Sequence, residues 1–219
     1  DGVPVTLTVY GVEVTVPEGS SVLLAAAHAQ RAVPKLCATD LVEAFGSCRV
    51  CLVEIEGQRG YPASCTTLVA PGMVVRTQSE RLTALRRGVM NLYLSEFPES
   101  EIPDGWSEFH RTLKEIGIEG LSSGDGRNHF ELPVDVSNPF FIFDPAKCIV
   151  CSRCVRACEE VQGTFALTIQ GRGFDSKVAA SQDEKFMESE CVSCGACVMA
   201  CPSHALVEKS LFPGGYERA

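Results

Sequence analysis

The chain has 219 residues, of which 45% are hydrophobic and 21% are charged, and its formal net charge at pH 7 is −9. This composition excludes intrinsic disorder and collagen-like structure, the apolar runs are too short for a bilayer span, and the acidity argues against a nucleic-acid partner. No initiator Met precedes Asp1 and no charged-then-apolar leader is present. We therefore expect trimmed ends or a piece of a longer protein, and a cytoplasmic location.

Residues 1–78 predict a compact α+β unit. Apolar residues, all valine except Leu7, alternate with polar residues over 5–9 and 12–16, which predicts a hairpin, and Ser20 or Ser21 can cap a helix over 22–32. Further strands are expected over 51–56, 61–66 and 73–77. This order is typical of a ferredoxin-like sheet curled over one helix.

Four cysteines lie within this unit, in the pattern Cys37-x10-Cys48-x2-Cys51-x13-Cys65. A close pair with one ligand before it and one well after it is the general layout of a plant-type [2Fe-2S] loop, although the first gap there is four residues. Bridging sulfides need backbone N–H donors and close approach of the chain. The small and polar residues around the cysteines fit that need: Gly46, Ser47, Ser64, Thr66 and Thr67. The alternatives are a four-thiolate zinc site or two redox-inert pairs.

Residues 79–137 predict a helical linker. Ser79 caps a helix over 80–96, which Pro98 stops, and a turn-rich break follows over 97–105. Apolar residues then recur at three- and four-residue steps from Trp106 to Ile116, so a short amphipathic helix is expected there, ending over 117–120. Residues 122–127 predict a surface loop.

Residues 138–219 carry a duplicated cysteine motif. After an expected strand over 140–143, the pattern C-x2-C-x2-C-x3-C occurs twice with a constant offset of 43, and an expected hairpin over 165–173 separates the copies. In the two-cluster bacterial arrangement the fourth cysteine of each copy serves the other cluster. This assigns Cys148, Cys151, Cys154 and Cys201 to one [4Fe-4S] cluster and Cys191, Cys194, Cys197 and Cys158 to a second. A pair of zinc sites is the alternative, but zinc usually takes two separated C-x2-C pairs.

All twelve cysteines are then iron ligands, for one [2Fe-2S] and two [4Fe-4S] clusters. No dinucleotide fingerprint, Walker A loop or hydrolase motif is present, so we find no catalytic residue and no substrate site on the chain. Three redox centres without a substrate site indicate a conductor of electrons. Three cations beside the first motif can raise the potential of its cluster, or can be ordinary surface charge: Lys147, Arg153 and Arg156.

The order of these motifs resembles the amino-terminal iron–sulfur region of the complex I 75-kDa-type subunit family. That family includes the diaphorase small subunit of NAD-reducing hydrogenase and the amino-terminal region of NAD-dependent formate dehydrogenase. Residues 174–178, 186–197 and 208–210 look most like the formate dehydrogenase branch. The resemblance implies a β-grasp [2Fe-2S] domain, a helical linker and a two-cluster ferredoxin-like domain.

One departure from the family concerns a further cluster. There the helix after the [2Fe-2S] domain ends in His-Pro, followed by three cysteines that bind an additional [4Fe-4S] cluster. Here Phe97 stands where the His would fall, and no cysteine lies between Cys65 and Cys148. We therefore expect the additional cluster to be absent.

The first hypothesis is an electron-transfer subunit or segment of a multisubunit NAD-linked formate dehydrogenase. Its partners would be a molybdenum or tungsten pterin subunit and a flavin subunit that reduces NAD. Two alternatives stay open: the same module in an NAD-reducing hydrogenase or complex I-like enzyme, and a free-standing ferredoxin-like carrier.

Overall fold

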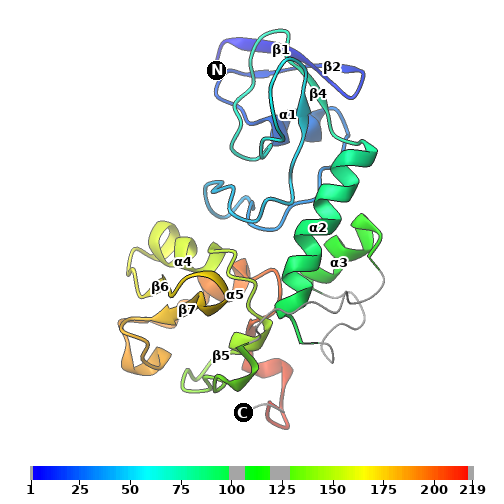
Figure 1. Ribbon diagram of the computed structural model, residues 1–219. Helices are drawn as coiled ribbons and strands as arrows, with labels where there is room; N and C mark the ends of the chain where they lie inside the picture. The colour runs from blue at the N-terminus through cyan, green and yellow to red at the C-terminus, as the bar shows by residue number, and fades with distance from the viewer. Residues whose placement is uncertain (1, 99–106, 119–128, 217–219) are drawn as a thin grey trace.

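The computed structural model describes residues 2–98, 107–118 and 129–216. Within these residues the strands, in chain order, are β1 (Pro4–Val9), β2 (Val12–Pro17), β3 (Glu54–Ile55), β4 (Val74–Arg76), β5 (Phe141–Phe143), β6 (Leu167–Gln170), β7 (Lys177–Ala180) and β8 (Leu206–Glu208). The α-helices are α1 (Val22–His28), α2 (Glu80–Glu96), α3 (Glu108–Ile116), α4 (Arg153–Ala157) and α5 (Ala196–Ala200). Figure 1 shows α2 running from the N-terminal sheet to the part of the molecule that contains α4 and α5.

The N-terminal sheet has the strand order β2-β1-β4-β3, with β1 parallel to β4 and the other pairs antiparallel. The alternating valines set its register: Val5 lies opposite Val16, and their buried side chains join the core beneath α1. The Ala-rich face of α1 packs on this sheet, and Ser21 accepts a hydrogen bond from the N–H of Leu24 as the N-cap. Aliphatic burial therefore holds this unit together.

The α2 and α3 helices form the linker, and each begins at a serine N-cap. Ser79 accepts from the N–H of Leu82, and Ser107 accepts from the N–H of His110. Gly117 ends α3 in the left-handed conformation, at φ 75°. Buried apolar side chains join the two helices to residues next to the cysteines: Leu36, Val50, Met90, Leu94, Phe97, Phe109, Leu113 and Ile149.

The C-terminal part has little regular structure. It consists of two two-stranded sheets, β5-β8 and β6-β7, with two five-residue helices. The end of α4 continues into a π-helical turn over Cys158–Gln162. Its core combines cysteines with aliphatic residues such as Leu167 and Leu206 and aromatic residues such as Phe141 and Phe186. The cysteines are thus part of the packing as well as candidate ligands.

Several elements differ from the sequence-based expectation. The first helix ends at His28, short of residue 32, because Gln30 takes a left-handed conformation at φ 55°. Residues 61–66 contribute one isolated bridge, Leu52 with Ala63, instead of a strand. The expected hairpin over 165–173 extends further along the chain, because its second strand is β7 at Lys177–Ala180, and β8 had no sequence signal. Trp106, the loop over 122–127 and most of the break over 97–105 lie outside the described residues.

No helix in the described part of the chain combines the length and the apolar character that a membrane crossing requires.

Candidate metal centres

The four N-terminal cysteines converge between the sheet and α2, and all four are buried. The N–H of Cys37 donates to Cys48 Sγ and the N–H of Cys48 donates to Cys37 Sγ, both at 3.4 Å. The Cys65 thiol interacts with both Cys37 and Cys51, and it lowers the pKa of Cys51 to about 6 despite the opposing effect of burial. The four cysteines therefore form one buried group of sulfurs.

Small and polar residues around these four cysteines hold the surrounding loop in its conformation. Gly46 has φ 73°, and a Cβ there would stand 3.1 Å from Thr66 Oγ1, so the position favours glycine. Ser64 is fully buried and donates to the Cys51 carbonyl at 2.8 Å. These contacts fix the loop that carries the sulfurs.

The C-terminal motif is duplicated in conformation as well as in sequence. The N–H of Val150 donates to Cys148 Sγ, and the N–H of Ser193 donates to Cys191 Sγ, both at 3.4 Å. Val150 and Ser193 are both left-handed, at φ 49° and 57°. Cys154 lies in α4 and Cys197 in α5, while Cys158 and Cys201 directly follow these helices. Each copy therefore folds as a loop that carries cysteines, followed by a short α-helix.

Electrostatic contacts group the C-terminal sulfurs across the two copies. Burial, with a further effect from Cys201, raises the pKa of Cys148 to about 12, and both causes also raise the pKa values of Cys151 and Cys154. Burial raises the pKa of Cys197 to about 12 as well, and Cys158 contributes to this shift and to that of Cys191. Cys201 thus lies near the first three cysteines of the first copy, and Cys158 lies near Cys191 and Cys197 of the second.

These residues fit iron–sulfur clusters by their chemistry. Backbone N–H groups donate to Cys158 Sγ from Ala166 at 3.3 Å and to Cys201 Sγ from Leu206 at 3.4 Å, as expected around anionic sulfur. Burying several thiolates together is costly unless cations compensate them. Among the described residues, no three His, Cys, Asp or Glu side chains are arranged around a single metal ion.

The N-terminal group and the first C-terminal group lie next to each other. Ser47 Oγ donates to the Cys151 carbonyl at 3.3 Å, and Tyr93 Oη donates to the Cys48 carbonyl at 3.3 Å. Burial raises the pKa of Tyr93, and the charges of Cys48 and Cys151 add to the shift. Cys37, Cys48 and Cys151 share one core cluster.

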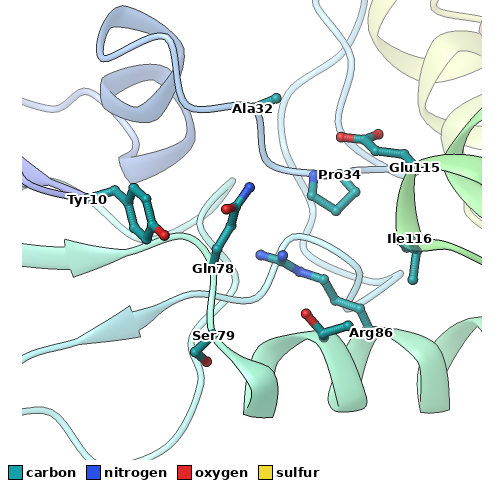
Figure 2. Close-up of a pocket in the computed structure, with 9 residues that line it drawn as sticks. Tyr10, Ala32, Pro34, Gln78, Ser79, Arg86, Glu115 and Ile116 are labelled. Carbon is teal, nitrogen blue, oxygen red and sulfur yellow. The ribbon is translucent and has the colours of Figure 1, made fainter.

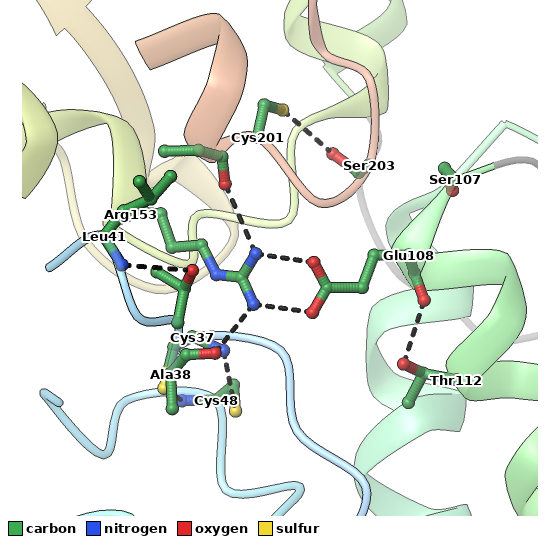
Figure 3. Close-up of polar contacts among 12 residues, drawn as sticks. Cys37, Ala38, Leu41, Cys48, Ser107, Glu108, Thr112, Arg153, Cys201 and Ser203 are labelled. Carbon is green, nitrogen blue, oxygen red and sulfur yellow. Dashed lines mark hydrogen bonds and ion pairs between the residues drawn. The ribbon is translucent and has the colours of Figure 1, made fainter. Parts of the chain in front are cut away.

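Arg153 lies at the centre of this junction (Figure 3) and is 3% exposed. Its two Nη atoms form a bidentate ion pair with the Glu108 carboxylate, at 2.7 Å each. They also donate to the carbonyls of Ala38 at 2.9 Å and Ala200 at 3.4 Å. One guanidinium thus touches the segments next to Cys37 and Cys201 as well as α3.

The other two cations beside the first motif have local partners. Arg156 pairs with Glu160 and lies over the Phe45 ring at 5.5 Å. Lys147 lies over the Tyr216 ring at 5.2 Å. Glu108 and Tyr93 could not be identified from the sequence, because no local pattern links either residue to the cysteine-bearing segments that it approaches in space.

The second C-terminal group reaches the surface at Cys194, which is exposed. A cavity of about 470 Å³ lies beside it, lined by Phe140 and Met199, whose side chains are 65% and 74% exposed. This apolar rim surrounds the cysteine that is most accessible among the twelve.

The comparisons with known proteins agree with this layout. Residues 2–80 match the family model of a 2Fe-2S iron-sulfur cluster binding domain, and residues 147–205 match that of a 4Fe-4S dicluster domain.

Two relatives and one solved structure are similar over nearly the whole chain. The NADP-reducing hydrogenase subunit HndD of Solidesulfovibrio fructosivorans is 37% identical over 93% of this chain and 36% of its own length. One of the subunits of the NADH-quinone oxidoreductase of Mycobacterium bovis is 36% identical over 92% of this chain and 25% of its own length. A chain in a crystal structure of NAD+-reducing [NiFe]-hydrogenase is 29% identical at a TM-score of 0.81, over 98% of this chain and 90% of that one.

This chain thus spans about a third or less of the two curated relatives. It combines a 2Fe-2S iron-sulfur cluster binding domain with a 4Fe-4S dicluster domain, and over nearly its whole length it is similar to parts of NAD(P)-linked hydrogenases and of an NADH-quinone oxidoreductase.

Proposed function

We propose that this chain is the iron–sulfur electron-transfer part of a multisubunit NAD(P)-linked oxidoreductase. The observation that carries the proposal is the series of three sulfur groups, of which the first two are neighbours at Ser47 and Cys151 and the last reaches the surface at Cys194. When bound, the clusters supply one-electron carriers. The chain holds these carriers, and it excludes water from the N-terminal group, whose four cysteines are all buried.

The proposed ligand sets follow the grouping of the sulfurs. Cys37, Cys48, Cys51 and Cys65 hold the [2Fe-2S] cluster. Cys148, Cys151, Cys154 and Cys201 hold one [4Fe-4S] cluster, and Cys158, Cys191, Cys194 and Cys197 hold the second. The proposed units are residues 1–78, 79–137 and 138–219, and the ranges of the two family models support the outer two.

The order of the groups supports a linear path. Ser47 and Tyr93 link the N-terminal group to the first C-terminal group. The charge of Cys197, in the second C-terminal group, contributes to the raised pKa of Cys154 in the first. Cys194 and its apolar rim are the proposed contact with the partner that carries the catalytic site. A flavin subunit that exchanges electrons with NAD(P) is the proposed partner at the N-terminal group.

Two kinds of catalytic partner are proposed. The names of the similar proteins favour a hydrogenase or a complex I-like enzyme. The formate dehydrogenase hypothesis, with its molybdenum or tungsten pterin subunit, rests on residues 174–178, 186–197 and 208–210.

The test is anaerobic purification of the chain with the subunits that remain bound, followed by assays of hydrogen-dependent and formate-dependent NAD(P) reduction. We expect about ten iron and about ten acid-labile sulfide per chain, and activity with one of the two donors. Hydrogen-dependent activity identifies a hydrogenase, and formate-dependent activity identifies a formate dehydrogenase. Isolation of the chain alone, without a flavin subunit, would contradict the subunit proposal in favour of a free carrier.

A further inference from the structure

Arg86 is a buried cation near the middle of α2, and it is 5% exposed. Its Nη2 donates to the carbonyls of Leu52 at 2.6 Å and Thr77 at 2.9 Å. Within the described part of the chain, its Nε has no hydrogen-bond partner and its guanidinium has no ion pair. Buried charges are almost always paired, so this arginine needs a source of negative charge.

Two anionic groups act on Arg86 without forming an ion pair with it. Leu52, whose carbonyl accepts from Arg86, directly follows Cys51 in the N-terminal sulfur group. Burial lowers the pKa of Arg86, whereas the charges of Cys51 and Glu115 act in the opposite direction. Glu115 is exposed on α3 and lines the same cavity of about 300 Å³ as Arg86 and Tyr10 (Figure 2). Water screens Glu115, whereas Cys51 is buried.

Arg86 therefore differs from Arg153, the other buried arginine near the sulfur groups. The Glu108 carboxylate neutralises Arg153 through two hydrogen bonds. The charge of Arg86 is held in place by two neutral carbonyls, and the buried Val50 and Val53 flank Cys51 and Leu52 in sequence. A charge in such surroundings acts more strongly on its neighbours than one in water.

We propose that Arg86 is the fixed countercharge of the N-terminal iron–sulfur site and sets the reduction potential of that site. The inference rests on the proposed [2Fe-2S] ligands. Reduction adds one electron and hence one negative charge to the site, without a proton. A fixed cation stabilises the reduced form more than the oxidised form, so it makes the potential more positive.

The experiment compares Arg86→Gln with Arg86→Lys in the full chain, purified anaerobically with its partners. A redox titration followed by electron paramagnetic resonance measures the midpoint potential of each cluster. For Arg86→Gln we expect about a tenfold fall in the reduced-to-oxidised ratio of the [2Fe-2S] cluster at fixed ambient potential, or about 59 mV for a one-electron couple. Arg86→Lys keeps the charge and should retain most of the potential.

The controls separate charge from folding. Arg81→Gln removes an exposed arginine from the same helix and should leave the [2Fe-2S] potential unchanged. The [4Fe-4S] potentials in the same sample should also stay constant. Arg86→Leu is a second charge-free variant that leaves no polar group at the position.

An unchanged [2Fe-2S] potential in Arg86→Gln would overturn the proposal. Equal shifts in the Gln and Lys variants, or a common shift of all clusters, would likewise assign Arg86 a purely structural role. Loss of the cluster in both charge-free variants but not in Arg86→Lys would support the need for charge, and loss in all three would contradict it. Absence of any [2Fe-2S] signal in the unmodified protein would instead refute the cluster assignment on which the inference rests.

Discussion

At the scale of single residues, the grouping of sulfurs across the two motif copies can be tested by one pair of substitutions. Cys201→Ser should disturb the [4Fe-4S] cluster near Cys148, and Cys158→Ser should disturb the one near Cys191, because each side chain lies with the other copy. Resonance spectra of the reduced protein should therefore lose different [4Fe-4S] signals in the two variants, while the [2Fe-2S] signal persists. If each substitution removed the cluster of its own copy, the ligand sets would have to be exchanged.

Much of the candidate site can be predicted from the sequence at this scale, because the spacing of cysteines is visible within short stretches of the chain. The offset of 43 between the copies predicts a common loop, and the shared left-handed residues Val150 and Ser193 fit that duplication. The contacts of Arg153 are harder to predict from the sequence. The sequence shows a cation beside a cluster motif, whereas its pairing with Glu108 depends on how α3 packs, and no pattern in either segment contains that information.

At the scale of elements, the Arg153–Glu108 ion pair joins α3 to α4. The Arg153 side chain is 4% exposed and that of Glu108 is 32% exposed. Glu108→Gln leaves the guanidinium without its countercharge, so we expect a loss of about 2 kcal/mol, below the roughly 3–5 kcal/mol of a fully buried pair. The midpoint of anaerobic denaturant unfolding, followed through cluster absorbance, measures this change.

A matched control for Glu108→Gln is Asp183→Asn, which removes the ion pair of the more exposed Lys177 and Asp183. We expect an effect of about 0.5 kcal/mol or less there, since surface pairs contribute little. Equal effects of the two substitutions would show that α3 and α4 are not held together by charge.

Elements with local start and stop signals were the most predictable. The expected helix over 80–96 agrees with α2 at both ends, because Ser79 caps it and Pro98 follows it closely. By contrast, β8 has three residues and pairs with β5 from a distant part of the sequence. Such a short strand forms through its partner and the cluster core, so its own residues give no signal.

At the scale of the whole molecule, the two halves differ in what holds them together. The N-terminal core is mainly aliphatic, with β1, β2 and α1 packed around valines and alanines. The C-terminal core is rich in cysteines, and its helices α4 and α5 have five residues each. Helices of this length are not stable alone, and metal binding energy becomes folding energy in such sites.

We therefore expect anaerobic removal of iron by a chelator to unfold the molecule unevenly. Amide hydrogen exchange should remain slow in β1 and β2, whereas α4, α5 and the β6-β7 hairpin should exchange as an unstructured chain does. Readdition of iron and sulfide should restore protection, which separates cluster loss from irreversible damage. Retained protection of α4 and α5 in the iron-free protein would mean that aliphatic and aromatic packing holds the C-terminal half, and that its clusters are carried by a preformed fold.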